Sequence, residues 1–256
     1  MITAGIDVGI EYTKAVVMKE GVLAGKACGY SGGAGRPAAV RSVYEQALEA
    51  AGVKAGDVEK VFATGKGKFD ADFADDRLAD VIAAAKAANL VVPEATMVID
   101  AGADEIAVAV LEGQEIKEFV INQKCAAGLG LFMEAMAERL EMTIEQLGAI
   151  DGQGGQSVND GCVVFAELDA LSLLNRGAGA GEVAAAVIEA CAWRASTTIN
   201  DIYKPDKSNV VMMGGLVQNG AFIKALERIS GIRFILPADP VYGGAIGAAA
   251  LAALAI

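Results

Sequence analysis

Residues 96–121 read TMVIDAGADEIAVAVLEGQEIKEFVI, where an apolar strand pattern ends in Asp100, a glycine follows two residues later, and two more strand patterns come after it. Residues 1–30 have the same order, because the strand pattern AGID ends in Asp7 and is followed by Gly9. A pattern that recurs in the same order at two places indicates an internal duplication. We therefore predict an α/β protein with two related halves.

The remaining segments supply further strands and the helices. Apolar residues at three- and four-residue steps predict helices. We place the seam between the halves near Pro93, so that they span 1–93 and 94–241, and expect the apolar residues 242–256 to form a helix that packs back on the first half. The other helices are expected at 37–51, 75–90, 126–147, 162–176, 181–203 and 219–229.

Composition excludes several classes of protein. The chain has 256 residues, a net charge of -12 and no histidine, so histidine cannot serve as base or metal ligand. The negative charge disfavours binding to nucleic acid or to an anionic membrane surface. The longest nearly apolar run, AIGAAALAALAI, is 12 residues, and a membrane-spanning helix needs about 20. Widely spaced cysteines and the absence of a leader pattern predict a cytoplasmic protein.

The repeated strand-Asp-x-Gly motif predicts a nucleotide site. A carboxylate at a strand end can hold Mg2+ or its waters, while the turn after it brings backbone amides to a phosphate. One such motif is common in ordinary turns, but Asp7 with Gly9 and Asp100 with Gly102 occur in matching contexts. Lys14 can add a positive charge for a phosphate. Two glycines after the strand VVMM would let a base or ribose approach the backbone: Gly214 and Gly215.

Two of the four cysteines lie where helix patterns begin. Cys125 in KCAAGLG and Cys162 in GCVVFAE would each sit near amide hydrogens and the positive end of a helix dipole, which stabilise a thiolate. The alternative is that they are small buried apolar residues. If they bind metal, two copies of the chain would provide the four ligands of an iron-sulfur cluster. Cys28 and Cys191 are expected in the core.

The sequence resembles the ATPases that activate 2-hydroxyacyl-CoA dehydratases, together with the ATPase subunits of benzoyl-CoA reductase. The resemblance runs the whole length, and the pairing of KCAAG with CxxFAE is its most specific part. It implies a duplicated sugar-kinase and actin-like fold with a nucleotide cleft between the halves. It also implies ATP hydrolysis with Mg2+ and a dimer whose single 4Fe-4S cluster is held by Cys125 and Cys162. Electrons from ferredoxin or flavodoxin would then reach an acyl-CoA reductase or dehydratase.

The resemblance also implies roles for residues of the two phosphate loops and of the glycine-rich strand ends. The expected catalytic residues are Asp7, Asp100, Asp104 and Glu105. The residues expected to contact the nucleotide are Gly9, Thr13, Lys14, Gly102, Gly214, Gly215, Gly243 and Gly244.

Both phosphate loops depart from the family pattern. GIEYTK has Ile10, Glu11 and Tyr12 where GSTxTK is usual, and DAGADE stands where DIGGQD is usual. A homodimer needs both loops intact, whereas a heterodimer lets one subunit drift. We therefore expect an ATP-hydrolysing subunit of the benzoyl-CoA reductase type, paired with a homologous ATPase subunit. The alternatives are a homodimeric dehydratase activator, a small-molecule kinase with core cysteines, and a pseudo-ATPase scaffold that carries the cluster.

Overall fold

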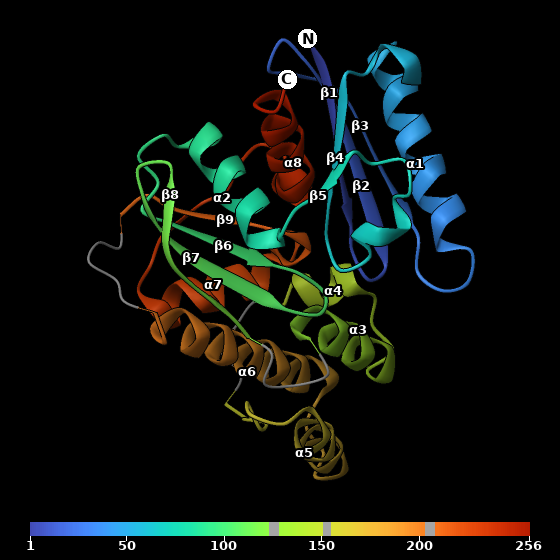
Figure 1. The fold of residues 1–256 in the computed structure, drawn as a ribbon. Coiled ribbons are helices and arrows are strands. Elements are labelled where there is room, and N and C mark those ends of the chain that lie inside the picture. The colour runs from blue at the N-terminus through green and yellow to red at the C-terminus, as the bar shows by residue number, and fades with distance from the viewer. Residues whose placement is uncertain (123–127, 151–154, 203–207) are drawn as a thin grey trace.

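The structure, a computed structural model, describes residues 1–122, 128–150, 155–202 and 208–256. Two five-stranded mixed sheets lie at an angle to each other, with helices on their faces and between them (Figure 1). Within these ranges no helix combines the length and apolar character needed to cross a membrane.

The first sheet begins with an antiparallel meander of three strands, and two parallel strands extend it on the other side of β1. Its order is β3-β2-β1-β4-β5. Helix α1 (Arg36–Ala51) connects β3 to β4 and packs on β3. The strands are β1 (Ile2–Val8), β2 (Tyr12–Lys19), β3 (Val22–Tyr30), β4 (Lys60–Thr64) and β5 (Asp76–Arg77).

The second sheet has the same topology, with the order β10-β9-β6-β7-β8. Each meander even carries a register shift at the equivalent place, after Val17 in β2 and after Val110 in β7. The predicted duplication is therefore confirmed. The strands are β6 (Met97–Ala101), β7 (Ile106–Glu112), β8 (Glu115–Ile121), β9 (Val210–Met213) and β10 (Phe234–Ile235).

The predicted helix 126–147 is wrong as a single element. Its described part is two helices, because Glu141 adopts a left-handed backbone (φ 55°) and Thr143 starts a new helix by accepting a hydrogen bond from Gln146 N–H. Likewise the predicted helix 75–90 begins only at Asp80, after β5. The helices of the second half are α3 (Leu129–Arg139), α4 (Ile144–Gly148), α5 (Val163–Asn175), α6 (Ala180–Asn200) and α7 (Gly220–Ser230).

Two helices, α2 (Asp80–Val91) and α8 (Gly243–Ala253), lie side by side between the sheets (Figure 1). They approach so closely that a Cβ on Gly247 would be 1.8 Å from the Ala83 carbonyl oxygen. Helix α8 is equally close to the first sheet, since a Cβ on Gly5 would be 1.9 Å from the Ala245 carbonyl oxygen. Helix α2 instead buries its alanines against β6, β7 and β9 of the second sheet.

Short 3-10 helices complete the connections. One of them, η4 (Pro240–Tyr242), leads directly into α8 and lies beside β2 and β9. The others are η1 (Ala55–Asp57), η2 (Lys68–Asp70) and η3 (Gly215–Gln218). The division of the chain at residue 93 stays a prediction.

Candidate nucleotide site between the two sheets

Asp7 and Asp100 occupy equivalent positions near the ends of β1 and β6. Each touches a glycine that directly follows the neighbouring parallel strand. A Cβ on Gly65 would be 2.7 Å from Asp7 Oδ1, and a Cβ on Gly214 would be 2.6 Å from Asp100 Oδ1. Both glycines also have left-handed φ angles, 90° and 100°. The duplication therefore reproduces the carboxylate together with the backbone turn beside it.

The first phosphate loop brings Lys14 over Asp7. Lys14 Nζ lies 3.8 Å from Asp7 Oδ2, and the two side chains are only 15% and 20% exposed. The turn before β2 is closed by a hydrogen bond of 3.1 Å from Gly9 N–H to the Tyr12 carbonyl. Thr13 is buried instead, with its hydroxyl 2.7 Å from Ser31 Oγ. The structure thus brings Gly9, Lys14 and Asp7 together, whereas the Thr13 hydroxyl is hydrogen-bonded to Ser31 and does not face the site.

Asp80, which sequence reasoning missed, is a third carboxylate at this site. It begins α2, and its Oδ1 accepts hydrogen bonds from Thr64 Oγ1 (3.2 Å) and Gly65 N–H (3.0 Å). Lys68 Nζ lies 3.6 Å from the same oxygen. Acidic residues are common at helix starts, because the positive end of the helix dipole stabilises them. The sequence around Asp80 therefore gave no sign that its carboxylate belongs to the site.

The three carboxylates disfavour one another's charge. Burial raises the pKa of Asp100 to about 7, and the charges of Asp7 and Asp80 contribute in the same direction. Burial also raises the pKa of Asp7, although Lys14 opposes this. A cation between Asp7 and Asp100 would reverse these effects, since it favours the charged carboxylates. The donor set therefore fits Mg2+, although no described group of three or more acidic or cysteine side chains is arranged to hold a metal by itself.

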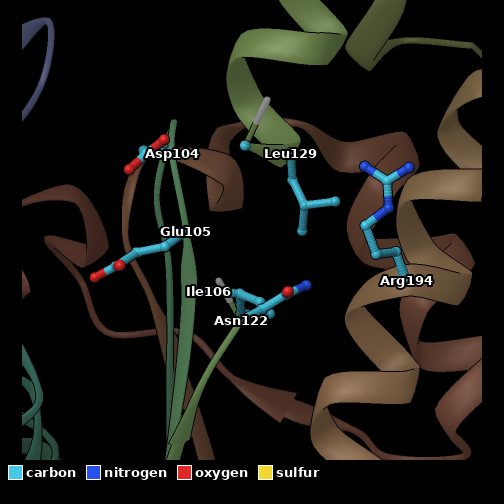
Figure 2. A pocket seen from close by; sticks show the side chains of 7 residues that line it. Asp104, Glu105, Ile106, Asn122, Leu129 and Arg194 are labelled. Carbon is cyan, nitrogen blue, oxygen red and sulfur yellow. The ribbon is translucent and has the colours of Figure 1, made fainter. Parts of the chain in front are cut away.

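The second phosphate loop, residues 102–105, is closed by a hydrogen bond of 2.9 Å from Gly102 N–H to the Glu105 carbonyl. It packs against the start of α3, where Leu131 N–H donates to the Ala103 carbonyl at 3.0 Å. Glu105 is held across the cleft by Lys66 of the first half, at 2.5 Å. Asp104 and Glu105 also line a small pocket opposite Arg194 of α6 (Figure 2).

The predicted glycines near the nucleotide differ in how they are packed. A Cβ on Gly244 would be 3.3 Å from Asp7 Oδ2, so the start of α8 borders the carboxylate. Gly243 packs on the Met213 side chain, with a Cβ position 2.3 Å from Sδ. Nothing lies within 4 Å of a Cβ on Gly215. Space therefore lies open beside Gly215, whereas Gly243 and Gly244 are closely packed.

Glu11, at the tip of the first phosphate loop, interacts with a carboxyl of the other half. Burial and the neighbouring Glu11 raise the pKa of Glu134, on α3, to about 7. Two carboxyls in contact favour sharing a proton or binding a cation. The Glu11 side chain thus interacts with Glu134 of α3.

The cysteines give a mixed result. Cys162 is the N-cap of α5 and is partly exposed, and its backbone N–H donates to Asn159 Oδ1 at 2.6 Å. Cys125 lies outside the described residues. Cys191 is buried as predicted, and burial raises its pKa to about 12. The prediction that Cys28 is a core residue is wrong, since it is exposed on β3. Cys162 is therefore accessible at the start of α5, and its role as a metal ligand together with Cys125 stays a prediction.

Helix α5 carries apolar side chains on its exposed face. Four of them are between 49% and 63% exposed, and their spacing puts them along one side of the helix. A contiguous exposed apolar surface of this kind marks an interaction site more often than a free surface. The residues are Val164, Phe165, Leu168 and Leu171.

The duplicated sheets and the cleft between them define a sugar-kinase and actin-like ATPase fold. A ROK family glucokinase from Streptomyces griseus, in complex with glucose and AMPPNP, has a TM-score of 0.63 over 99% of this chain and 100% of its own, and shares the fold at 16% identity. Within that fold, the chain belongs to the BadF/BadG/BcrA/BcrD ATPase family, which matches residues 4–252. The resemblance predicted from the motifs is confirmed.

Relatives of known function cover almost the whole chain. The 2-hydroxyisocaproyl-CoA dehydratase activator of Clostridioides difficile is 32% identical, over 97% of this chain and 94% of its own length. The activator of lactoyl-CoA dehydratase of Anaerotignum propionicum is 33% identical over 97% and 96%. One of the benzoyl-CoA reductase subunits of Thauera aromatica is 29% identical, over 80% and 75%.

A solved structure agrees with this relationship. The activator of the 2-hydroxyisocaproyl-CoA dehydratase from Clostridium difficile with bound ADPNP has a TM-score of 0.90 and 31% identity, over 98% of this chain and 94% of that chain. The relatives favour the dehydratase activators over the benzoyl-CoA reductase type that the loop departures had suggested.

Proposed function

We propose that this chain is the ATP-hydrolysing activator of an acyl-CoA dehydratase. The observation that carries the proposal is the pair of equivalent aspartates, Asp7 and Asp100, each beside a glycine turn at the cleft of a fold shared with a nucleotide-bound activator. The benzoyl-CoA reductase type is the second candidate, and the departures in the phosphate loops favour it. We prefer the dehydratase activator, because the relatives that match nearly the whole chain at 32% and 33% identity are activators of dehydratases.

In this proposal, Asp7 and Asp100 hold Mg2+ through its waters, and Lys14 contacts a phosphate. The backbone amides near Gly9 and Gly102 would approach the phosphates, and Gly215 would leave room for the adenosine. Bound Mg2+ would neutralise charge on the phosphates and on both carboxylates.

The water that attacks the phosphate needs a group to orient it. We assign Asp104 or Glu105 to this role, with Asp80 as a further carboxylate within the cleft. The ion pair of 2.5 Å with Lys66 occupies one oxygen of Glu105, and release from Lys66 would free both oxygens for the water. Phosphate binding by Lys66 would release Glu105, since a phosphate competes for the same ammonium group.

For electron transfer we propose a 4Fe-4S cluster held by Cys125 and Cys162 of two subunits. When bound, the cluster would supply a single low-potential electron. The start of α5 would help to hold it, because amide hydrogens and the helix dipole stabilise negative charge. Such a cluster would join two subunits, and the other partners would be an electron donor, a ferredoxin or flavodoxin, and the dehydratase.

The apolar face of α5 supports the dimer. Val164 and Phe165 lie in the first turn of α5, two and three residues after Cys162, so a partner that shared a cluster at Cys162 would reach them as well. We propose a homodimer, and a heterodimer with a homologous ATPase subunit as the alternative. In either case the chain would divide near residue 93.

One experiment tests the proposal against a small-molecule kinase and a pseudo-ATPase scaffold. The chain is purified without oxygen, and its iron, acid-labile sulfide and phosphate release with Mg-ATP are measured. An activator has about two irons for each chain and hydrolyses ATP, and Asp7→Asn lowers hydrolysis by orders of magnitude. A kinase would contain no iron, and a scaffold would contain iron but release no phosphate.

A further inference from the structure

Arg194 on α6 has a buried guanidinium that is only partly used. Its Nε donates a hydrogen bond of 2.6 Å to the Asp160 carbonyl, and its Cζ lies 5.9 Å from the ring centre of Phe132 on α3. Both Nη atoms are buried, and neither has a hydrogen-bond partner among the residues that the structure describes. A buried charged donor without a partner is costly. The site therefore holds a cation that lacks its anion.

Carboxylates lie in the same pocket but do not pair with it. Figure 2 shows Asp104 and Glu105 on one side and Arg194 on the other, with Glu105 pointing away from the guanidinium. Glu105 is already paired with Lys66. Among the described residues Asp104 forms no ion pair, although its charge helps to raise the pKa of Lys66, so its carboxylate is available to pair with Arg194 across the pocket that both line.

Arg194 lies between the two proposed centres of the protein, because it lines the same pocket as Asp104 and Glu105 and also bonds the chain just before Cys162. On one side, the loop that carries Asp104 rests on the start of α3, since a Cβ on Gly130 would be 2.7 Å from Ala103 Cα. On the other side, the bond to the Asp160 carbonyl fixes the chain two residues before Cys162. A movement of the loop that lets Asp104 pair with Arg194 would thus reach the start of α5 through the hydrogen bond from Arg194 Nε to the Asp160 carbonyl.

We infer that Arg194 is a positioning residue: when nucleotide moves loop 102–105, Asp104 pairs with Arg194, and the pairing shifts the turn that carries Cys162. The inference rests on the proposed function, because it needs a nucleotide at this loop. Pairing is favourable because each partner gains a charge-assisted hydrogen bond. The coupling is reciprocal for binding, so a ligand bound at Cys162 and the nucleotide would change each other's affinity by the same factor.

The test measures how fast the Cys162 thiol is alkylated in the full-length, iron-free chain, by mass spectrometry of its peptide. A nonhydrolysable ATP analogue with Mg2+ should change this rate at least threefold in the wild type. Arg194→Gln should bind the analogue within about tenfold of the wild-type affinity but show almost no change in rate. Arg176→Gln, which alters an exposed arginine at the end of α5, should keep the full change.

Arg194→Gln should also leave the thermal midpoint of the nucleotide-free protein near that of the wild type, since the loss of the hydrogen bond to the Asp160 carbonyl is offset by removal of a buried charge whose Nη atoms have no described partner. A purely structural arginine would not give this combination. If Arg194→Gln does not fold, Asp104→Asn tests the same pair from the loop and should abolish the effect on Cys162. The inference is overturned if either variant keeps the nucleotide effect, or if bound nucleotide leaves the wild-type rate unchanged. Failure of the wild type to bind the analogue would instead overturn the proposed function.

Discussion

Replacing Asp100 by asparagine should stabilise the nucleotide-free protein at alkaline pH. The folded protein raises the pKa of Asp100 from 3.8 to about 7. Between these values the folded state binds a proton that the unfolded state has released, so stability falls as the pH rises through this window. The asparagine side chain carries no charge at any pH, and the Asp100→Asn variant should not lose this stability.

The pKa change corresponds to about 4 kcal/mol, at about 1.4 kcal/mol for each tenfold step in the proton equilibrium. This is an upper limit, because part of the Asp100 side chain touches solvent. We expect Asp100→Asn to be about 1–2 kcal/mol more stable than the wild type at pH 8, and about a third of that difference should remain at pH 5.

Urea unfolding at both pH values, with EDTA and without nucleotide, measures this difference. Glu118→Gln, at an exposed position on β8, is the control and should follow the wild type. The reasoning is refuted if Asp100→Asn is less stable than the wild type at pH 8, or if its stability falls with pH as steeply.

Three further outcomes are expected. Cys162→Ala should remove the iron of anaerobically purified protein, whereas Cys28→Ala should retain it, as iron and sulfide analysis will tell. Gly247→Ala should lower the free energy of unfolding by about 1–3 kcal/mol, because its Cβ would meet the backbone of α2. The control is Gly181→Ala, which lies in open space on α6 and should be neutral or slightly stabilising. Glu11→Gln should tighten binding of a nonhydrolysable ATP analogue about fivefold in calorimetry, and unchanged binding would show that this carboxylate does not oppose the phosphates.

The repeated strand patterns predicted the duplication because the same order of apolar strand, aspartate, glycine and two further strands occurs in both meanders. Strand β5 was missed because two residues, Asp76 and Arg77, are too few to show any period. The break at Glu141 was missed for another reason: helical spacing of apolar residues continues across it, and only the left-handed backbone ends α3.

At the site, sequence indicated the residues whose neighbours in the chain already suggested chemistry. Asp7 and Asp100 share a local motif, so the duplication identified them. Asp80 is brought beside them only by the packing of α2, which no local pattern reveals. Thr13 could have been assigned better, since alternation along β2 sends it to the opposite face from Lys14.

Each half of the sequence supplies a helix that packs on the sheet of the other half, and this packing determines how the chain can be divided. Helix α2 lies in the first part of the sequence but covers the second sheet, and α8 ends the sequence but covers β1. A fragment that stops at residue 93 would leave the Gly5 face of β1 bare and expose the alanines of α2. The fragment that begins at 94 would expose α8 and the apolar face of β6. We therefore expect each piece to be insoluble when it is expressed alone, and the two pieces to fold together when both are made in the same cell.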